Sequence, residues 1–347
     1  MSAAEKIRKK QRLKLILAEI VENLKDYFEE LQVQKFGKKS RFIVLTDIAQ
    51  VHKIGSKGLN LVIADFNSEL GTMRLSIAIK RFSNTDEALK NKILTERLSN
   101  RLRGTGVSTP RVIFEDGPTL IYEGIPGETF YDSTLLDQRL KLKLAGEALA
   151  KYHTTALRQV DSERYFFLLQ QTLKTLELPH DERAKLISSA ERYLSVFSTY
   201  SSGTAIFGDF HPGNILFSNM NGSIQTWLID PEYVEEERTA DRMEDIATFF
   251  LRNALDYFQT RHNLNGFRKK ILPFFEGYAA FLNQFELSFN KIYQGQVETT
   301  FAFHLGLCSL LESLFVKQLG DLNNQTILDR FNICISLTRH CWEKGID

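Results

Sequence analysis

The 347-residue chain has few cysteines, few prolines and almost no excess charge. Its three cysteines, Cys308, Cys334 and Cys341, stand singly, which argues against a disulfide framework and against a structural zinc site. Lys and Arg number 44, and Asp and Glu number 43. The chain therefore has no global field to hold a polyanion, and nucleic-acid binding is not expected. Only 7 prolines accompany 26 phenylalanines, a composition that favours a helix-rich core.

Long apolar runs are missing as well. The basic N-terminus has no apolar core of the kind that defines a signal peptide. The most apolar stretch, 301–316, is interrupted by polar residues and falls short of the roughly 18 residues that cross a bilayer. With 43% hydrophobic and 25% charged residues, the composition is that of a globular protein. We therefore expect a soluble, cytoplasmic chain.

Residues 5–32 are predicted to form an amphipathic helix, because apolar residues recur every three or four positions from Leu13 to Leu31. The start of this helix is basic and the remainder is acidic. A helix lying on a membrane surface is one interpretation, but anionic lipid would repel the acidic part. Packing of this helix against the body of the protein is therefore favoured.

Downstream, the sequence changes from strand-like to helix-like patterns. Strands are predicted at 42–45, 59–66, 73–82, 111–114 and 119–122, with one helix at 85–102 that begins at Asn84 as N-cap and uses Glu87 as capping-box partner. Later helices are predicted at 135–157, 165–176, 181–197, 241–258, 267–285, 296–319 and 325–344. Pro273 should kink or break the fifth of these. Strands return at 215–217 and 224–229 around Asn221-Gly222, a strong hairpin signal.

This order of elements predicts an α+β fold with two lobes. Residues 1–36 hold the N-terminal helix, 37–125 a small β-rich lobe, and 126–347 a large, mainly helical lobe in which the hairpin is embedded.

The strongest chemical signal is the run Phe207-Gly208-Asp209-Phe210-His211-Pro212-Gly213-Asn214. Its Pro-Gly turn can bring the side chains of Asp209 and Asn214 to one point. An ionised aspartate can accept a hydroxyl proton, and an amide oxygen can bind a hard cation. The hairpin then ends in Asp230, whose charge after a buried strand a divalent cation would compensate. Asp209, Asn214 and Asp230 therefore predict phosphoryl transfer that depends on Mg²⁺.

Nucleotide binding is predicted from three segments of the β-rich lobe. Ile77-Ala78-Ile79-Lys80 has the form V-A-I-K, in which a strand lysine contacts phosphates. Such a lysine needs an acidic residue from the next helix. Glu96 is the candidate, because Glu87 is assigned to the cap and because Glu96, among apolar neighbours, is expected to project from the buried face. The loop at 55–60, with Ser56 and Gly58, could cover phosphates with backbone N–H groups. The 120–127 segment could hydrogen-bond the edge of a base near Glu123 and Ile125.

These motifs resemble those of the aminoglycoside phosphotransferase and choline kinase family, which shares the protein-kinase-like fold. The family's catalytic loop H-G-D-x-H-x-x-N is similar to 207–214, with Phe207 in place of the first histidine. The family's I-D-x-E and R-x-x-D-[IL]-A motifs are similar to 229–232 and 242–247, and 144–153 is similar to the helix before its catalytic region. The resemblance covers about residues 41–260.

The resemblance implies a two-lobe, kinase-like enzyme that uses ATP and Mg²⁺. It makes Asp209 the catalytic base and Asn214 and Asp230 the metal ligands. It implies further that the α- and β-phosphates are bound by Lys80, that Lys80 is oriented by Glu96, and that adenine is contacted at Glu123 and Ile125. His211 and Asp245 are expected to brace the catalytic loop, and His153 is expected to be a satisfied residue at a helix end.

The expected acceptor is a small molecule that bears a hydroxyl group, such as an amino alcohol, an aminoglycoside or a sugar. The reason is that no long peptide-docking segment separates Asp230 from the Asp245 helix. Two alternatives stay open. One is a protein-serine kinase, and the other is a non-catalytic pseudokinase or a scaffold that holds a partner with its N-terminal helix. A scaffold would have no chemical need for Lys80, Asp209, Asn214 and Asp230 together.

Overall fold

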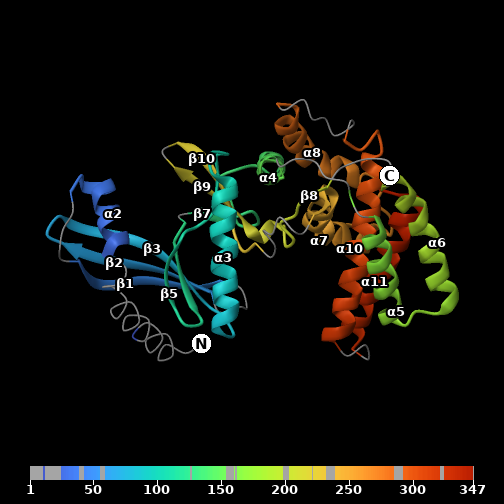
Figure 1. Cartoon of the computed structure of the whole chain (residues 1–347), viewed down its shortest axis with the longest axis horizontal. Coiled ribbons are helices and arrows are strands. Elements are labelled where there is room, and N and C mark those ends of the chain that lie inside the picture. Colours follow the sequence, from blue (N-terminus) through green and yellow to red (C-terminus); the bar gives the residue numbers. More distant parts are fainter. Residues whose placement is uncertain are drawn as a thin grey trace. The chain divides into compact units, whose positions relative to one another are not determined.

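The structure is a computed structural model, shown in Figure 1, and it describes residues 11, 25–38, 43–54, 59–125, 127–153, 160, 162–197, 203–220, 222–231, 239–284, 292–320 and 324–346. The chain divides into two compact units. Unit 1 comprises Met1–Arg103, Ser108–Gly127 and Ser218–Ile229, and unit 2 comprises Gly104–Val107, Glu128–Phe217 and Asp230–Asp347. Unit 1 is rich in strands and unit 2 in helices, which confirms the predicted α+β class. Residues 218–229, which the sequence analysis placed in the helical lobe, belong to unit 1.

Unit 1 is built on an antiparallel sheet of five strands in the order β1-β2-β3-β6-β5. The strands are β1 (Ile43–Ile54), β2 (Leu59–Ser68), β3 (Gly71–Arg81), β5 (Val112–Asp116) and β6 (Thr119–Glu123). Tight turns join β2 to β3 and β5 to β6, where Ser68 pairs with Gly71 and Asp116 with Thr119. Gly71 and Gly117 supply the positive φ angles, 129° and 53°, that these turns need.

Two helices cover opposite faces of this sheet. On one face, Phe28 of α2 (Lys25–Phe36) packs with Ile77 and Ile121. On the other face, Ala88 of α3 (Thr85–Leu102) packs with Leu120 and Tyr122. Successive residues of a strand point to opposite faces, so the neighbours Leu120 and Ile121 assign one helix to each.

The predicted capping box at the start of α3 is confirmed. The Glu87 N–H donates to Asn84 Oδ1 at 2.8 Å, and the Ser83 N–H donates to Glu87 Oε2 at 3.0 Å. The helix spans Thr85–Leu102, the range that the sequence predicted. Capping of this kind satisfies N–H groups that have no partner within the helix.

The predicted hairpin consists of β9 (Ile215–Met220) and β10 (Ser223–Leu228). Together with the short strands β4 (Val107–Ser108) and β7 (Gly127–Thr129) it forms a sheet in the order β4-β10-β9-β7. The Trp227 indole N–H donates to Ser218 Oγ across the hairpin at 2.9 Å. Gly222 has a φ of 85°, as a tight hairpin turn requires.

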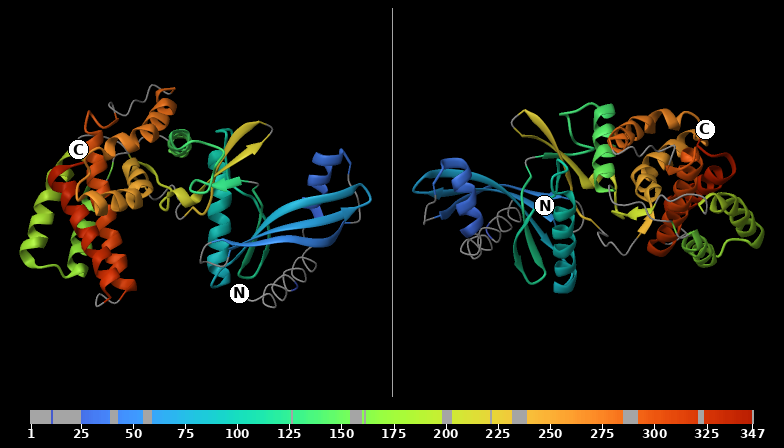
Figure 2. Two further views of the ribbon diagram at one scale, coloured as in Figure 1. Left: turned by 180° about the vertical axis from the view of Figure 1, so that it is seen from behind. Right: turned by 45° about the horizontal axis from the view of Figure 1, so that its top comes forward.

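The helices of unit 2 agree with those predicted. They are α4 (Gln138–Tyr152), α5 (Ser162–Leu176), α6 (His180–Phe197), α7 (Arg242–Arg261), α8 (Phe267–Asn283), α10 (Val297–Leu319) and α11 (Gln325–Lys344). The two views of Figure 2 show α10 and α11 side by side. A short antiparallel pair, β8 (Gly203–Ala205) and β11 (Thr239–Asp241), leads into the catalytic loop and into α7.

Pro273 does not break α8, which runs from Phe267 to Asn283 with the proline inside, so the expected break is wrong. Two glycines let α4 and α8 approach closely. A Cβ atom at Gly146 would collide with the Phe274 carbonyl of α8, and one at Gly277 would collide with the Lys143 carbonyl of α4. Neither position therefore has room for a side chain.

Among the described residues, only α10 is long and apolar enough in its Val297–Gln318 stretch to cross a membrane. Within unit 2, however, 67% of its most apolar window is buried. Buried side chains of α10 include Phe301, Phe303 and Leu305. The length and composition of α10 are therefore those of a core helix.

Candidate active site

The catalytic loop, residues 207–214, is anchored in unit 2 by two aromatic side chains. Phe207 and Phe210 are both fully buried. The Phe207 ring packs edge-on against Tyr152, with centroids 5.5 Å apart, and Phe210 lies 5.6 Å from Phe249. Phe207 thus braces the loop by apolar packing at the position where the family usually has a histidine. The side chain of Asp209, between these anchors, is 46% exposed.

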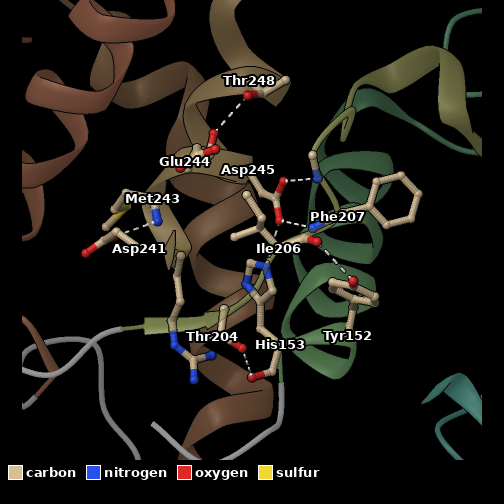
Figure 3. A network of polar contacts seen from close by, with 12 residues as sticks. Tyr152, His153, Thr204, Ile206, Phe207, Asp241, Met243, Glu244, Asp245 and Thr248 are labelled. Atoms are coloured by element: carbon tan, nitrogen blue, oxygen red, sulfur yellow. Dashed lines mark hydrogen bonds and ion pairs between the residues drawn. The ribbon is translucent and has the colours of Figure 1, made fainter. Parts of the chain in front are cut away.

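Asp245 holds the start of the loop through its backbone. This fully buried carboxylate, near the start of α7, accepts the Phe207 N–H at 2.7 Å and the Gly208 N–H at 2.8 Å. Figure 3 shows Asp245 reaching from the helix toward Phe207. Gly208 has a φ of 91°, which a residue with a side chain rarely adopts. The expectation that Asp245 braces the catalytic loop is confirmed.

A chain of buried polar groups stands behind Asp245. His153 Nε2 lies 2.9 Å from Asp245 Oδ2, and His153 Nδ1 lies 2.6 Å from the Tyr278 hydroxyl. Arg242 donates to the same hydroxyl at 3.3 Å. Burial raises the pKa of Tyr278 to about 12, so its hydroxyl stays protonated and can donate to Nδ1 while Nε2–H donates to Asp245. His153 is therefore the satisfied residue at a helix end that the sequence predicted.

The second half of the loop sets the position of Asn214. The His211 ring accepts the Gly213 N–H at 2.9 Å, which confirms the bracing role expected of His211. Asn214 donates through Nδ2 to the Asp209 carbonyl at 2.9 Å and lies 3.5 Å from Asp209 Oδ2. His211 Nε2 lies 3.6 Å from the same carboxylate oxygen. Asp209 and Asn214 are thus brought together, as predicted.

The two residues predicted to bind a metal, Asn214 and Asp230, carry oxygen atoms of the kind that a hard cation prefers. The bond from Asn214 Nδ2 to a carbonyl turns the amide so that Oδ1 remains the available ligand atom. Asp230, after β10, has a left-handed backbone with a φ of 52° directly before Pro231. Such a conformation in a residue other than glycine costs of order 1–3 kcal/mol and is concentrated at functional sites. Carboxylate and amide oxygens are the ligands that Mg²⁺ prefers.

No group of three or more His, Cys, Asp or Glu residues suited to a metal occurs in the described part of the chain. A cation at this site would therefore rely on Asn214 and Asp230, together with oxygens of a bound substrate, as is usual for Mg²⁺. The side chain of Glu232, in the motif after Asp230, lies outside the described residues.

In unit 1, the predicted phosphate-binding lysine lies on β3. The Lys80 ammonium is 5.0 Å from the centroid of the Phe82 ring. Glu96, in contrast, lies on the exposed face of α3, while its neighbour Thr95 faces the core. The expectation that Glu96 projects from the buried face is therefore wrong. The pKa of Lys92 is raised mainly by a hydrogen bond to Glu115, and also by the charge of Glu96.

The edge of the sheet at Glu123 has an irregular hydrogen-bond pattern. The Glu123 N–H donates to the Arg111 carbonyl at 2.9 Å. In a regular antiparallel pair the Arg111 N–H would donate back to the Glu123 carbonyl. It donates instead to the Glu123 carboxylate, at Oε1 and 2.9 Å. The Glu123 carboxylate thus accepts the hydrogen bond from the Arg111 N–H that the Glu123 carbonyl would accept in a regular sheet.

Ile125, two residues further on, has its carbonyl engaged by the Gly127 N–H at 2.8 Å. The Gly124 N–H continues the ladder with the Ser76 carbonyl at 2.8 Å. Ser56 and Gly58, in the loop that was expected to cover phosphates, lie outside the described residues.

Comparison with known proteins agrees with the motifs. Residues 72–262 match the phosphotransferase enzyme family, APH. The chain belongs to this phosphotransferase family. No curated protein matches the chain.

Several solved structures share the fold of this chain. Macrolide 2'-phosphotransferase MphH from Brachybacterium faecium has a TM-score of 0.51 at 13% identity over 88% of this chain and 98% of its own. Macrolide 2'-phosphotransferase type I has a TM-score of 0.51 at 14% identity, covering 88% of this chain and 95% of its own. Choline kinase LicA from Streptococcus pneumoniae has a TM-score of 0.50 at 16% identity, covering 90% and 98%. The likeness establishes the protein-kinase-like fold.

Two contributors to the site were missed by sequence reasoning. Tyr278 lies on α8, beyond any recognised motif, and only the packing of α8 on α4 brings it to His153. Arg111 could have been found, because the β5–β6 turn places it opposite Glu123, and opposite charges across a strand pair attract each other.

Proposed function

We propose that the chain is an ATP-dependent phosphotransferase that moves the γ-phosphoryl group to a hydroxyl of a small molecule in the cytoplasm. The observation that carries the proposal is the catalytic loop. It is anchored by buried groups at Phe207 and Asp245, and it leaves the Asp209 carboxylate exposed. Phosphoryl transfer needs such an arrangement, because the side chain of the general base must reach the acceptor hydroxyl while the backbone of the loop that carries it stays fixed.

Asp209 would act as the base. As the acceptor oxygen bonds to the γ-phosphorus, the bond from that phosphorus to the bridging oxygen breaks and the nucleoside diphosphate leaves. The acceptor's hydroxyl proton passes to an Asp209 carboxylate oxygen. Positioning by Asn214, which donates to the Asp209 carbonyl at 2.9 Å, would hold the base in line with the hydroxyl.

Asn214 Oδ1 and the Asp230 carboxylate would hold Mg²⁺. When bound, this ion offsets negative charge on the phosphate oxygens. Lys80 would add a positive charge at the α- and β-phosphates. Backbone N–H groups of Ser56 and Gly58 are proposed from the sequence as further phosphate-binding groups.

Adenine would be read by the Glu123 carbonyl and the Ile125 N–H. Adenine presents a donor at N6 and an acceptor at N1, which match this pair of groups. Guanine presents an acceptor at O6 and a donor at N1, the reverse of this order. The order of the two backbone groups therefore supports ATP over GTP.

The acceptor class is proposed from the family and from the sequence. Named structural neighbours are a choline kinase and two macrolide phosphotransferases, whose acceptors are small molecules. An amino alcohol, an aminoglycoside or a sugar would suit the same chemistry. No observation favours a protein substrate.

A labelling experiment tests this proposal. We expect γ-labelled ATP, incubated with the chain and Mg²⁺, to label a member of a panel of hydroxyl-bearing metabolites and to leave casein unlabelled. Labelling of casein alone would contradict the proposal and favour a protein-serine kinase. Binding of ATP with no transfer to either panel would favour the pseudokinase.

A further inference from the structure

The N-terminal helix α2 contacts the residues that hold Glu123. Its Glu30 carboxylate accepts hydrogen bonds from Arg111 at 3.2 and 3.3 Å. The same guanidinium donates through Nε to Glu123 Oε2 at 3.2 Å. Arg111 therefore lies between a carboxylate of α2 and a carboxylate at the end of β6. All these residues belong to unit 1.

Tyr27, also on α2, completes this cluster. The Arg111 guanidinium lies over the Tyr27 ring, 5.6 Å from its centroid, a distance at which a cation and an aromatic face attract each other. Burial, and next the charge of Glu123, raise the pKa of Tyr27 to about 12. Glu123 and Tyr27 are thus close enough for the charge of one to act on the other.

The position of α2 does not depend on these polar contacts. Phe28 is fully buried against Phe66, with ring centroids 4.5 Å apart. At the other end of the helix, Lys35 donates to the Thr72 carbonyl at 3.2 Å. Apolar packing therefore fixes the helix, and the fixed helix presents Glu30 and Tyr27 to Arg111.

We propose that α2 is a nucleotide-affinity element, in which Glu30 and Arg111 are positioning residues for the Glu123 carbonyl. The residue Arg111 can be paired with Glu123 in two ways. In one, the Arg111 N–H donates to the Glu123 carbonyl, as in a regular ladder. In the other, which the structure shows, the Arg111 N–H donates to the Glu123 carboxylate and no longer to the Glu123 carbonyl. Only the second leaves that carbonyl for adenine.

Glu30 favours the second arrangement by holding the Arg111 guanidinium beside the Glu123 carboxylate. Glu30 holds the guanidinium at Nη1 and so keeps Nε directed at Glu123 Oε2, and loss of Glu30 frees the Arg111 side chain to rotate away from the Glu123 carboxylate. The carbonyl would then return to the ladder more often, and adenine would lose its acceptor. The inference rests on the proposed role of Glu123 in binding ATP, and it assigns a function to a helix that precedes the family match at 72–262.

The test measures binding of a non-hydrolysable ATP analogue with Mg²⁺ to the full chain by calorimetry. Glu30→Gln removes the charge that holds Arg111, and Lys35→Gln removes the tether at the opposite end of α2. We expect Glu30→Gln to weaken binding about threefold, the scale of an exposed ion-pair network, and Lys35→Gln to leave it unchanged. Inorganic tripolyphosphate, which has no base, should compete equally well in all variants.

A double-mutant cycle sharpens the result. Once Arg111→Gln has broken the link, adding Glu30→Gln should produce no further loss of affinity. Equal losses in Glu30→Gln and Lys35→Gln would overturn the inference, because α2 would then act only through its packing. Unchanged affinity in Glu30→Gln would overturn it as well. Absence of analogue binding in the wild type would instead reject the proposed function itself.

Discussion

The predicted catalytic loop at 207–214 and the sheet edge at Glu123, where we propose that adenine binds, are held by opposite means. The loop depends on Asp245, which is fully buried and accepts two backbone N–H groups. The edge depends on Arg111, whose side chain is 46% exposed and which pairs with Glu30 and Glu123 at the surface. Buried charged hydrogen bonds are strong and costly to break, whereas exposed pairs are weak and screened by salt.

The difference teaches where rigidity is needed. The residue that accepts the proton must be held in place within fractions of an ångström for in-line transfer, and a displacement of about 1 Å can cost a hundredfold in rate. The sheet edge at Glu123 has only to present two hydrogen-bonding groups to adenine. Variants at the loop should therefore change both turnover and stability, and variants at the edge should change nucleotide affinity alone.

The largest effect is expected for Asp245→Asn. The amide would place an N–H₂ group against the Phe207 or Gly208 N–H, or against His153. We expect a loss of about 3 kcal/mol in the free energy of unfolding and a fall of at least about a hundredfold in turnover. Chemical denaturation and transfer assays measure the two quantities. Asp256→Asn, an exposed change on the same helix, serves as the control, and equal stability in both variants would contradict the bracing role.

Tyr278→Phe should have the next largest effect. It removes the hydroxyl between Arg242 and His153 but keeps the ring. Leaving buried polar groups without this partner is expected to cost about 2 kcal/mol and to lower turnover through Asp245. Tyr131→Phe removes a hydroxyl from a tyrosine that is 54% exposed in the same unit, and it should change stability by less than about 0.5 kcal/mol. Similar losses in the two variants would refute the buried chain.

The sequence could predict the parts of this site that depend on residues close together in the chain. Asp209 and Asn214 lie in one short motif, and the local hydrogen bond between them is why their proximity could be predicted. Asp245 reaches Phe207 across 38 positions, so its bracing role was predicted from the resemblance to the family and not from local spacing. The start of α3 was equally local, because the Asn84 side chain accepts the Glu87 N–H and the Glu87 carboxylate accepts the Ser83 N–H. Interactions within about five residues leave a pattern in the sequence.

Contacts between distant segments leave no such pattern. Tyr278 meets His153 across 125 positions, and Glu30 meets Arg111 across 81. Glu96 was misplaced because its exposure depends on the rotation of α3 against the sheet, which the mixed residues around it did not decide. The short strands β8 and β11 were also missed, because three residues are too few to show an alternation.

A smaller effect on stability is expected from pH through His304, on α10. Burial lowers the pKa of His304 to about 3, so the folded state holds fewer protons than the unfolded state below pH 6.5. The free energy of unfolding should therefore fall as the pH drops, by about 1.4 kcal/mol at pH 5.5 for this group. Unfolding curves at pH 7.5 and 5.5 should show a steeper loss for the wild type than for His304→Gln. Equal slopes would contradict the assignment.

The proposed chemistry is tested most directly by Asp209→Asn. The substitution keeps the shape of the side chain and removes its ability to accept a proton, which general-base catalysis makes worth about 100- to 10,000-fold. With γ-labelled ATP and the acceptor found in the metabolite panel, we predict that transfer falls by at least about a hundredfold, while binding of a non-hydrolysable ATP analogue is unchanged. Equal transfer rates in wild type and variant would show that Asp209 is not the base.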